Sequence, residues 1–178
     1  MVIWLTGMSG SGKTTLCTAM HAVLKPRLKQ LVKLDGDEIR AAFGDDLTHA
    51  ESDRVRQINR IQRIAKILAD QGMVVLVAAL YAHPELLAWN RKNLPGYFEV
   101  YLKATVGFLG TRDPKGLYRK AQNGELRDLV GVDIPWNEPQ QPDLVIDAEN
   151  SKLPDALALD VLARIPKIAG QRTADLIR

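Results

Sequence analysis

Apolar runs and helix-periodic segments alternate along this chain, and their order predicts an α/β fold. The runs expected to form strands are 2–6, 30–35, 73–80, 97–103 and 143–147. The third is apolar from Met73 to Leu80, as a central strand buried on both faces must be. Helical periodicity falls at 13–24, 37–43, 53–70, 84–92, 105–111, 116–123 and 153–165. Strands that alternate with helices indicate three layers, with a parallel sheet in the middle.

Two further patterns concern how these elements are connected. The segment 53–70 carries one apolar stripe at three- and four-residue spacing, and Gly72 follows it as a stop signal. The stretch 128–143 contains three prolines and predicts an ordered loop packed across the molecule, not a linker between domains. No internal repeat or low-complexity tract interrupts the pattern. We therefore expect one domain over residues 1–178.

The composition narrows the class of protein. The net charge of +3, from 24 basic and 21 acidic residues, favours small anionic ligands and not a nucleic acid polymer. The single cysteine, Cys17, cannot form an internal disulfide, so we expect a buried thiol in a reducing compartment. The longest apolar run, Met73–Tyr81, is too short to cross a membrane, and no basic leader precedes Val2. These features predict a soluble, cytoplasmic protein without a membrane partner.

A glycine-rich octapeptide follows the first predicted strand directly. It reads Gly7-Met8-Ser9-Gly10-Ser11-Gly12-Lys13-Thr14, the G-x-x-x-x-G-K-T pattern of a phosphate-binding loop. Glycines let consecutive N–H groups point at an anion, Lys13 can reach the terminal phosphates, and the Thr14 hydroxyl suits Mg²⁺. The sequence therefore predicts a nucleoside triphosphate site, with the phosphates held by Gly7, Ser9, Gly10, Ser11, Gly12, Lys13, Thr14 and Thr15.

A chance match and a dinucleotide-binding loop both fit this octapeptide less well. A glycine-rich turn that matches by chance needs neither the strand before it nor the helix after it, and both are predicted here. A dinucleotide-binding loop needs a third glycine, but Thr15 occupies that position. The strand–loop–helix context favours the phosphate-binding loop.

Acidic residues follow the second predicted strand, in Leu34-Asp35-Gly36-Asp37. Ligands of parallel α/β sheets lie beyond the carboxyl ends of the strands, so Asp35 and Asp37 are expected to face the phosphate loop. An acid there can hold a metal and accept the proton of an attacking hydroxyl, which makes Asp37 a candidate catalytic residue and metal ligand. The alternative is that Asp37 only caps the following helix.

A cluster of cationic residues occupies 112–127. Arg112, Lys115, Arg119, Lys120 and Arg127 would form a solvated helix face in most proteins. Here glycines at 116 and 124 flank the cluster. They favour a hinged lid that brings positive charge over transferring phosphates.

The chain resembles the adenylylsulfate (APS) kinases over residues 2 to about 147. The resemblance rests on the phosphate loop, on Leu-Asp-Gly-Asp-x-x-Arg at 34–40, on Arg-Asp-Pro-Lys-Gly-Leu-Tyr at 112–118, and on Gly-Val-Asp at 131–133. It implies a P-loop kinase fold, with ATP- and Mg²⁺-dependent phosphorylation of a nucleotide's ribose hydroxyl by a homodimer. It also implies a catalytic Lys115, an Arg112 beside the ATP base, and a substrate site made from Asp35, Arg40, His49, Arg54, Gln57, Lys115, Gly116, Leu117 and Leu129.

The acceptor side departs from the family pattern. Where the family has Ile-Ser-Pro-aromatic-Arg after the third strand, this chain has Leu-Tyr-Ala-His-Pro at 80–84. Where the family stacks the acceptor base between two phenylalanines, this chain has His49 and Leu129, and Gln57 replaces an asparagine. A related branch acts on cytidine diphosphoramidate, so the acceptor stays open between APS and such a conjugate.

Two other classes of protein fit the sequence less well than a kinase. A GTPase switch needs an Asn-Lys-x-Asp guanine motif, which the sequence lacks. A non-catalytic ATP-binding regulatory module would have lost Lys13 or the acid after the second strand, and both are present. Unrelated small-molecule kinases share the phosphate loop but not the 112–118 heptapeptide.

Overall fold

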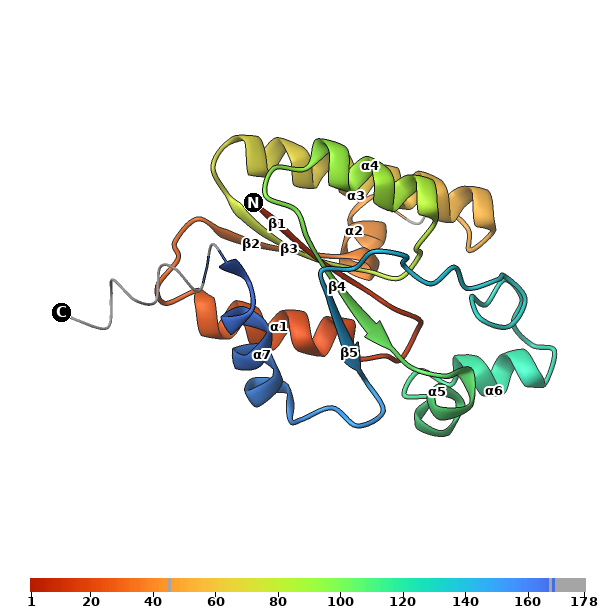
Figure 1. Ribbon diagram of the computed structural model, residues 1–178. Helices are drawn as coiled ribbons and strands as arrows, with labels where there is room; N and C mark the ends of the chain where they lie inside the picture. Colours follow the sequence, from red (N-terminus) through yellow and green to blue (C-terminus); the bar gives the residue numbers. More distant parts are fainter. Residues whose placement is uncertain (45, 167, 169–178) are drawn as a thin grey trace.

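A parallel sheet forms the centre of the protein in the computed structural model, which describes residues 1–44, 46–166 and 168 (Figure 1). Its order is β2-β3-β1-β4-β5, with every pairing parallel. β3 lies between β2 and β1, as expected for an apolar run buried on both faces. The strands are β1 (Val2–Thr6), β2 (Leu31–Asp35), β3 (Val74–Ala79), β4 (Phe98–Lys103) and β5 (Leu144–Asp147).

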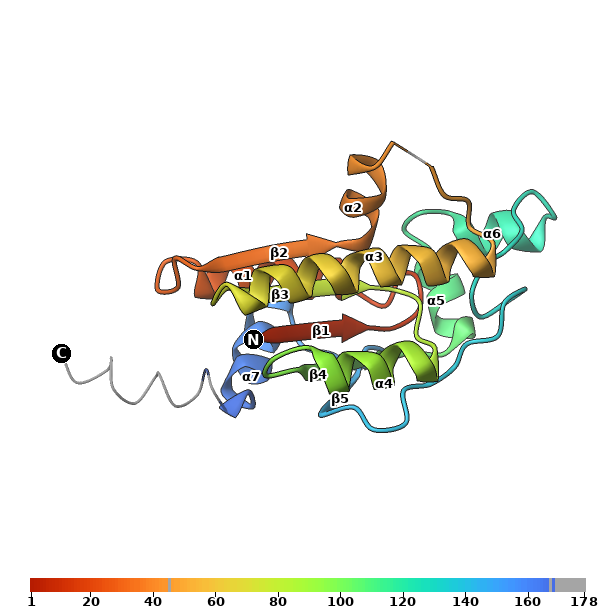
Figure 2. The same cartoon turned by 90° about the horizontal axis from the view of Figure 1, so that it is seen from above.

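Helices cover both faces of this sheet, so the three-layer α/β expectation is confirmed (Figures 1 and 2). α1 (Lys13–Leu24) and α7 (Pro154–Ala163) pack on one face. α3 (Glu51–Asp70) and α4 (Pro84–Asn93) pack on the other. The short helices lie beyond the carboxyl ends of the strands; they are α2 (Gly36–Ala42), α5 (Val106–Arg112) and α6 (Leu117–Gln122). Each element lies within two residues of its expected range.

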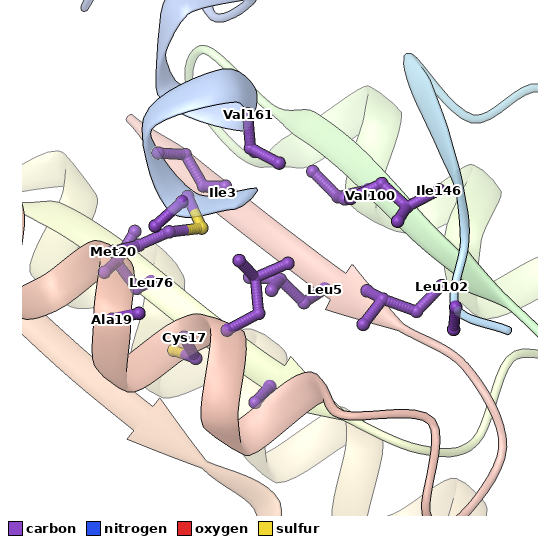
Figure 3. Close-up of a cluster of buried hydrophobic side chains, with 14 of the residues drawn as sticks. Ile3, Leu5, Cys17, Ala19, Met20, Leu76, Val100, Leu102, Ile146 and Val161 are labelled. Atoms are coloured by element: carbon purple, nitrogen blue, oxygen red, sulfur yellow. The ribbon is translucent and has the colours of Figure 1, made fainter. Parts of the chain in front are cut away.

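Alternation along β1 divides the core between the two faces of the sheet. Ile3 and Leu5 point toward α1 and α7, whereas Val2 and Trp4 point toward α3 and α4. Figure 3 shows side chains of α1, α7 and the strands meeting in the first of these cores. Cys17 is fully buried there, and burial raises the pKa of its thiol to about 12. The expectation of a buried cysteine is confirmed.

The segment 128–143 is an ordered loop, as its prolines predict. Trp136 donates its indole N–H to the Tyr101 hydroxyl of β4 at 3.1 Å. Near its end, Arg91 of α4 donates to the Gln141 carbonyl at 2.7 Å and contacts Asp143. These anchors hold the connection from the cationic segment to β5 against the sheet. At the start of the loop, the Leu129 backbone N–H donates to Asp133 Oδ2 at 3.0 Å, which holds Leu129 in place.

Chain topology brings the chemically active residues together at one edge of the sheet. The loop after β1, the turn from β2 into α2, and the residues after β3 all leave from the carboxyl ends of parallel strands. Across the described ranges, no helix has the length and apolar character needed to span a membrane.

Candidate active site

The loop between β1 and α1 has the conformation of an anion cradle. Gly12 ends it with φ +95°, a left-handed conformation that side chains disfavour, and α1 begins at the next residue. Gly7 is required by close approach, because a Cβ there would lie 2.6 Å from the Leu102 carbonyl oxygen. A tight loop of this kind, which leads directly into the positive end of α1, fits phosphate binding.

Lys13 lies across this loop. Its Nζ donates to the Met8 carbonyl oxygen at 2.7 Å. Burial of the ammonium group lowers the pKa of Lys13 to about 8, although Asp37 and Asp35 favour the charged form. A bound triphosphate would place further negative charge beside this ammonium group and favour its protonated form, so the position suits an anionic ligand.

Thr14 and Asp35 supply oxygen atoms that fit a divalent cation. The Thr14 hydroxyl donates to Asp35 Oδ2 at 2.7 Å, although the two residues lie 21 positions apart. Hydroxyl and carboxylate oxygens are the ligands that Mg²⁺ prefers. Within the described residues, the buried Ser11 Oγ of the same loop has no hydrogen-bond partner. A buried polar atom without a partner is costly, so it also fits a ligand with phosphate oxygens and a metal.

Asp35, not Asp37, caps the helix that follows β2. The Asp35 Oδ1 accepts from the Asp37 backbone N–H at 2.9 Å, which satisfies an otherwise free donor at the start of α2. The capping alternative for Asp37 is therefore wrong. Its carboxylate instead accepts from Lys115 Nζ at 2.5 Å.

The Lys115 contact joins the cationic segment to the end of β2. Partial burial tends to raise the pKa of Asp37, but the hydrogen bond and charge of Lys115 outweigh burial and lower it below its usual value. Gly116 and Gly124, on either side of α6, both have left-handed conformations, with φ of +66° and +74°. The two glycines lie at the two ends of α6, where the hinges of a lid are expected. That this segment acts as a lid stays a prediction.

A cavity of about 610 Å³ brings most of the expected site residues together. Its walls combine the phosphate loop, the start of α2, the first half of α3, the end of β3 and the 112–129 segment. Expected residues that line it are Ser9, Gly10, Gly12, Lys13, Thr14, Thr15, Asp35, Asp37, Arg40, His49, Arg54, Gln57, Arg112, Lys115, Leu117 and Leu129. Gly7, Ser11 and Gly116 are not among the lining residues, because they form the back of the loop and the turn before α6.

Two arginines of the expected substrate site bond to backbone carbonyls in this structure. Arg40 donates to the carbonyls of Leu47 and Thr48, at 2.8 and 3.0 Å. Arg54 donates to the Asp128 carbonyl at 2.7 Å, and its buried Nε has no partner within the described residues. Burial and the neighbouring Arg40 lower the pKa of Arg54. Positive charge is therefore concentrated at this wall of the cavity, which suits an anionic ligand.

The residues at the base-stacking positions are not a matched aromatic pair. Leu129 is 4% exposed and packs into the wall. Partial burial and the charges of Arg54 and Arg40 lower the pKa of His49, which favours a neutral imidazole. One imidazole ring and one aliphatic side chain thus occupy these two positions.

Sequence reasoning did not place Tyr81 in the site. It lines the cavity, and its hydroxyl donates to Glu51 Oε1 at 2.5 Å. The two residues are 30 positions apart and meet only because β3 ends beside the start of α3. The signal that could have found Tyr81 is its position directly after a buried parallel strand.

A second cavity, of about 730 Å³, lies against β5 and the 131–136 loop. Its walls carry the acids Asp133, Asp147 and Glu149, and its cation Lys103 is paired with Glu138. Negative charge of this kind repels phosphates, so the cavity at the phosphate loop is the better candidate for the nucleotide chemistry.

The phosphate loop, the acid at the end of β2 and the cationic segment over the same cavity define the protein as a P-loop kinase. The family model for adenylylsulphate kinase matches residues 1–147, and the chain belongs to that family. It is 44% identical over 149 residues to the cytidine diphosphoramidate kinase of Campylobacter jejuni, covering 82% of this chain and 85% of that protein. It is 36% identical over 159 residues to the adenylyl-sulfate kinase of Staphylococcus carnosus, covering 88% and 80%.

The fold agrees with this membership. The APS kinase CysC of Mycobacterium tuberculosis, solved in complex with AMPPNP and APS, superposes with a TM-score of 0.83 at 33% identity. The match covers 93% of this chain and 96% of that one. A shikimate kinase from Acinetobacter baumannii, at 19% identity and a TM-score of 0.60, shares the fold alone. The expected kinase of the APS-kinase type is confirmed, and the GTPase alternative is not supported.

Proposed function

We propose that this kinase uses ATP and Mg²⁺ to phosphorylate a ribose hydroxyl of cytidine diphosphoramidate in preference to APS. The observation that carries the proposal is the acceptor end of the cavity, where His49 and Leu129 replace an aromatic pair. The relative with 44% identity, which is named for that pyrimidine conjugate, supports it.

The donor half of the cavity holds ATP. The loop amides and Lys13 bind the β- and γ-phosphates, and the exposed Arg112 lies by the adenine. Thr14 and Asp35 would hold Mg²⁺, and Asp37, the ligand expected from the sequence, lines the same cavity. The ion would neutralise charge on the phosphate chain, as in other P-loop kinases.

Asp37 acts on the acceptor. Its carboxylate takes the proton of the ribose hydroxyl as that oxygen forms a bond to the γ-phosphorus. The bond between this phosphorus and the β,γ-bridging oxygen breaks, and ADP leaves. Lys115, which contacts Asp37 in the free protein, turns to the phosphoryl oxygens when substrates fill the site. The 112–127 segment then excludes water.

The acceptor pocket accommodates a small pyrimidine base better than it accommodates adenine. Stacking a base on an aromatic ring is worth about 1–3 kcal/mol, which at 1.4 kcal/mol per decade is about five- to 150-fold per ring. Since His49 still offers a ring and Leu129 still packs, the lower end of that range applies to each position. A larger purine loses more contact at both walls than a pyrimidine does.

The test is kcat/KM for APS and for cytidine diphosphoramidate, in the parent and in a His49→Phe, Leu129→Phe double variant. We expect the double variant to gain about fivefold or more on APS for each restored ring. The gain on the cytidine conjugate should be smaller. Efficient APS turnover by the parent, with no improvement in the double variant, contradicts the proposal.

APS itself is the second candidate acceptor. The favouring observations are the adenylylsulphate kinase family model and the fold match to an enzyme solved with APS. A non-catalytic ATP-binding module is disfavoured, because Lys13 and Asp37 both line the cavity. We further propose that the protein is a cytoplasmic homodimer, on the family resemblance and the reducing compartment implied by Cys17.

A further inference from the structure

Tyr81 lines the cavity and forms a polar pair with the exposed Glu51, which is not among the lining residues. Tyr81 follows β3 and is 3% exposed, and Glu51 begins α3. Arg54 lies three residues after Glu51, on the same side of the helix, and is close enough to Tyr81 to interact with it electrostatically. A hydroxyl and a guanidinium therefore lie close together in the cavity wall, with a carboxylate bonded to the hydroxyl.

The hydrogen bond between the pair determines what Tyr81 can offer to a ligand. A phenol has one O–H donor and acceptor lone pairs. Its donor is already committed to Glu51 Oε1, at 2.5 Å. Burial and this hydrogen bond raise the pKa of Tyr81, so the hydroxyl stays protonated across the neutral range. Toward the cavity, Tyr81 can therefore only accept a hydrogen bond.

Phosphoramidate and sulfate differ in just this respect. The terminal group of a nucleoside diphosphoramidate carries a neutral P–NH₂, which has two N–H donors beside its anionic oxygens. The terminal sulfate of APS carries only acceptor oxygens. A hydroxyl oxygen that acts only as an acceptor forms a good hydrogen bond with the P–NH₂ group. Against the sulfate it faces only other acceptor oxygens, and the nearby carboxylate adds charge repulsion.

We propose that Tyr81 is a specificity-determining residue that accepts an N–H hydrogen bond from the terminal phosphoramidate, and that Glu51 is the positioning residue that orients the phenol. This inference rests on the proposed function, since it explains how the same pocket selects the amino group. Arg54 meets the phosphoramidate's anionic oxygen, and this division of contacts fixes the orientation of the terminal group.

The experiment compares three acceptors in the same ATP-coupled assay: cytidine diphosphoramidate, cytidine diphosphate and APS. The first two differ at one substituent of the terminal phosphorus, NH₂ against oxygen, and by the extra negative charge that this oxygen carries at neutral pH. The change of their kcat/KM ratio in each variant, relative to the control variant, therefore reports on the amino group. The variants are Tyr81→Phe, which keeps the ring, and Glu51→Ala, which removes the acceptor of the phenol's hydrogen bond. Glu85→Ala is the matched control, because Glu85 is likewise an exposed acid in the first turn of a helix, α4.

We expect the parent to prefer cytidine diphosphoramidate over cytidine diphosphate by about tenfold, the effect of one well-placed hydrogen bond. Tyr81→Phe should remove most of this preference by lowering kcat/KM for the amidate alone. Glu51→Ala should reduce it by raising kcat/KM for cytidine diphosphate and APS, because the phenol can then donate. Glu85→Ala should leave the ratio unchanged. Should Tyr81→Phe fold poorly, the exposed Glu51 still provides the test.

The two proposals fail in different ways. An unchanged ratio in both variants, with the parent still preferring the amidate over APS, overturns the role of Tyr81 and Glu51 and leaves the proposed function standing. A parent that prefers APS over cytidine diphosphoramidate overturns both.

Discussion

Replacing Asp37 by asparagine should separate catalysis from stability, because the structure assigns the helix cap to its neighbour. The Asp37 carboxylate touches Lys115 while the two side chains are 74% and 60% exposed. An exposed ion pair of this kind contributes about 0–1 kcal/mol to the free energy of unfolding. In a domain of this size, 1 kcal/mol lowers Tm by about 2–4 °C, so Asp37→Asn should stay within that range.

Asp35→Ala supplies the contrasting case. It removes the cap of α2 and the partner of the Thr14 hydroxyl, each worth about 1 kcal/mol. The expected loss of about 2 kcal/mol lowers Tm by about 4–8 °C. Asp37→Asn should instead lower kcat by on the order of 10²–10⁴, the contribution of a positioned general base, with little change in the KM for ATP.

The assay pairs thermal unfolding with steady-state kinetics on both variants. An Asp37→Asn protein that melts 4–8 °C lower while its kcat stays within about twofold of the parent would refute the assignment. Such a result would return Asp37 to a structural role, against the geometry of the Asp35 cap.

Three further predictions concern the donor half and the lid. Lys13→Ala should lower turnover by on the order of 10²–10³ while circular dichroism stays unchanged, because the lysine neutralises phosphates and is not part of the core; normal turnover would remove Lys13 from the mechanism. In the free enzyme Lys13 carries its charge below its pKa of about 8, so kcat/KM for ATP should fall as pH rises through that value. A profile that stays flat to pH 10 contradicts the lowered pKa. Amide hydrogen exchange across 112–127 should slow when an ATP analogue and acceptor bind together, and no added protection argues against a lid.

The fold was predictable because its signals are local. The run Met73–Leu80 contains no polar residue that could face solvent, so it predicts a strand buried on both faces. β3 is indeed an inner strand of the sheet. The long helix α3 begins at Glu51, two residues before its expected start, because the acids at its amino end already belong to the first turn. Strand order is a property of the whole molecule, and no local pattern specified it.

The site was predictable where chemistry is carried by a contiguous motif. The phosphate loop and the acids Asp35 and Asp37 could be identified from contiguous stretches of sequence. Both stretches contribute residues to the wall of the same cavity. Which acid caps α2 depended on backbone geometry and could not be read in that way. The Tyr81–Glu51 contact depends on the packing of β3 against α3, so composition and spacing held no sign of it.

The preference of the acceptor pocket for cytidine diphosphoramidate over APS is measured most directly by competition in one vessel. Both acceptors are present at equal concentration with limiting ATP, and the two phosphorylated products are separated early in the reaction. Their ratio equals the ratio of the two kcat/KM values. We expect at least about a tenfold excess of the cytidine product, from two weakened stacking positions. An equal yield, or an excess of phosphorylated APS, would contradict the proposed selectivity.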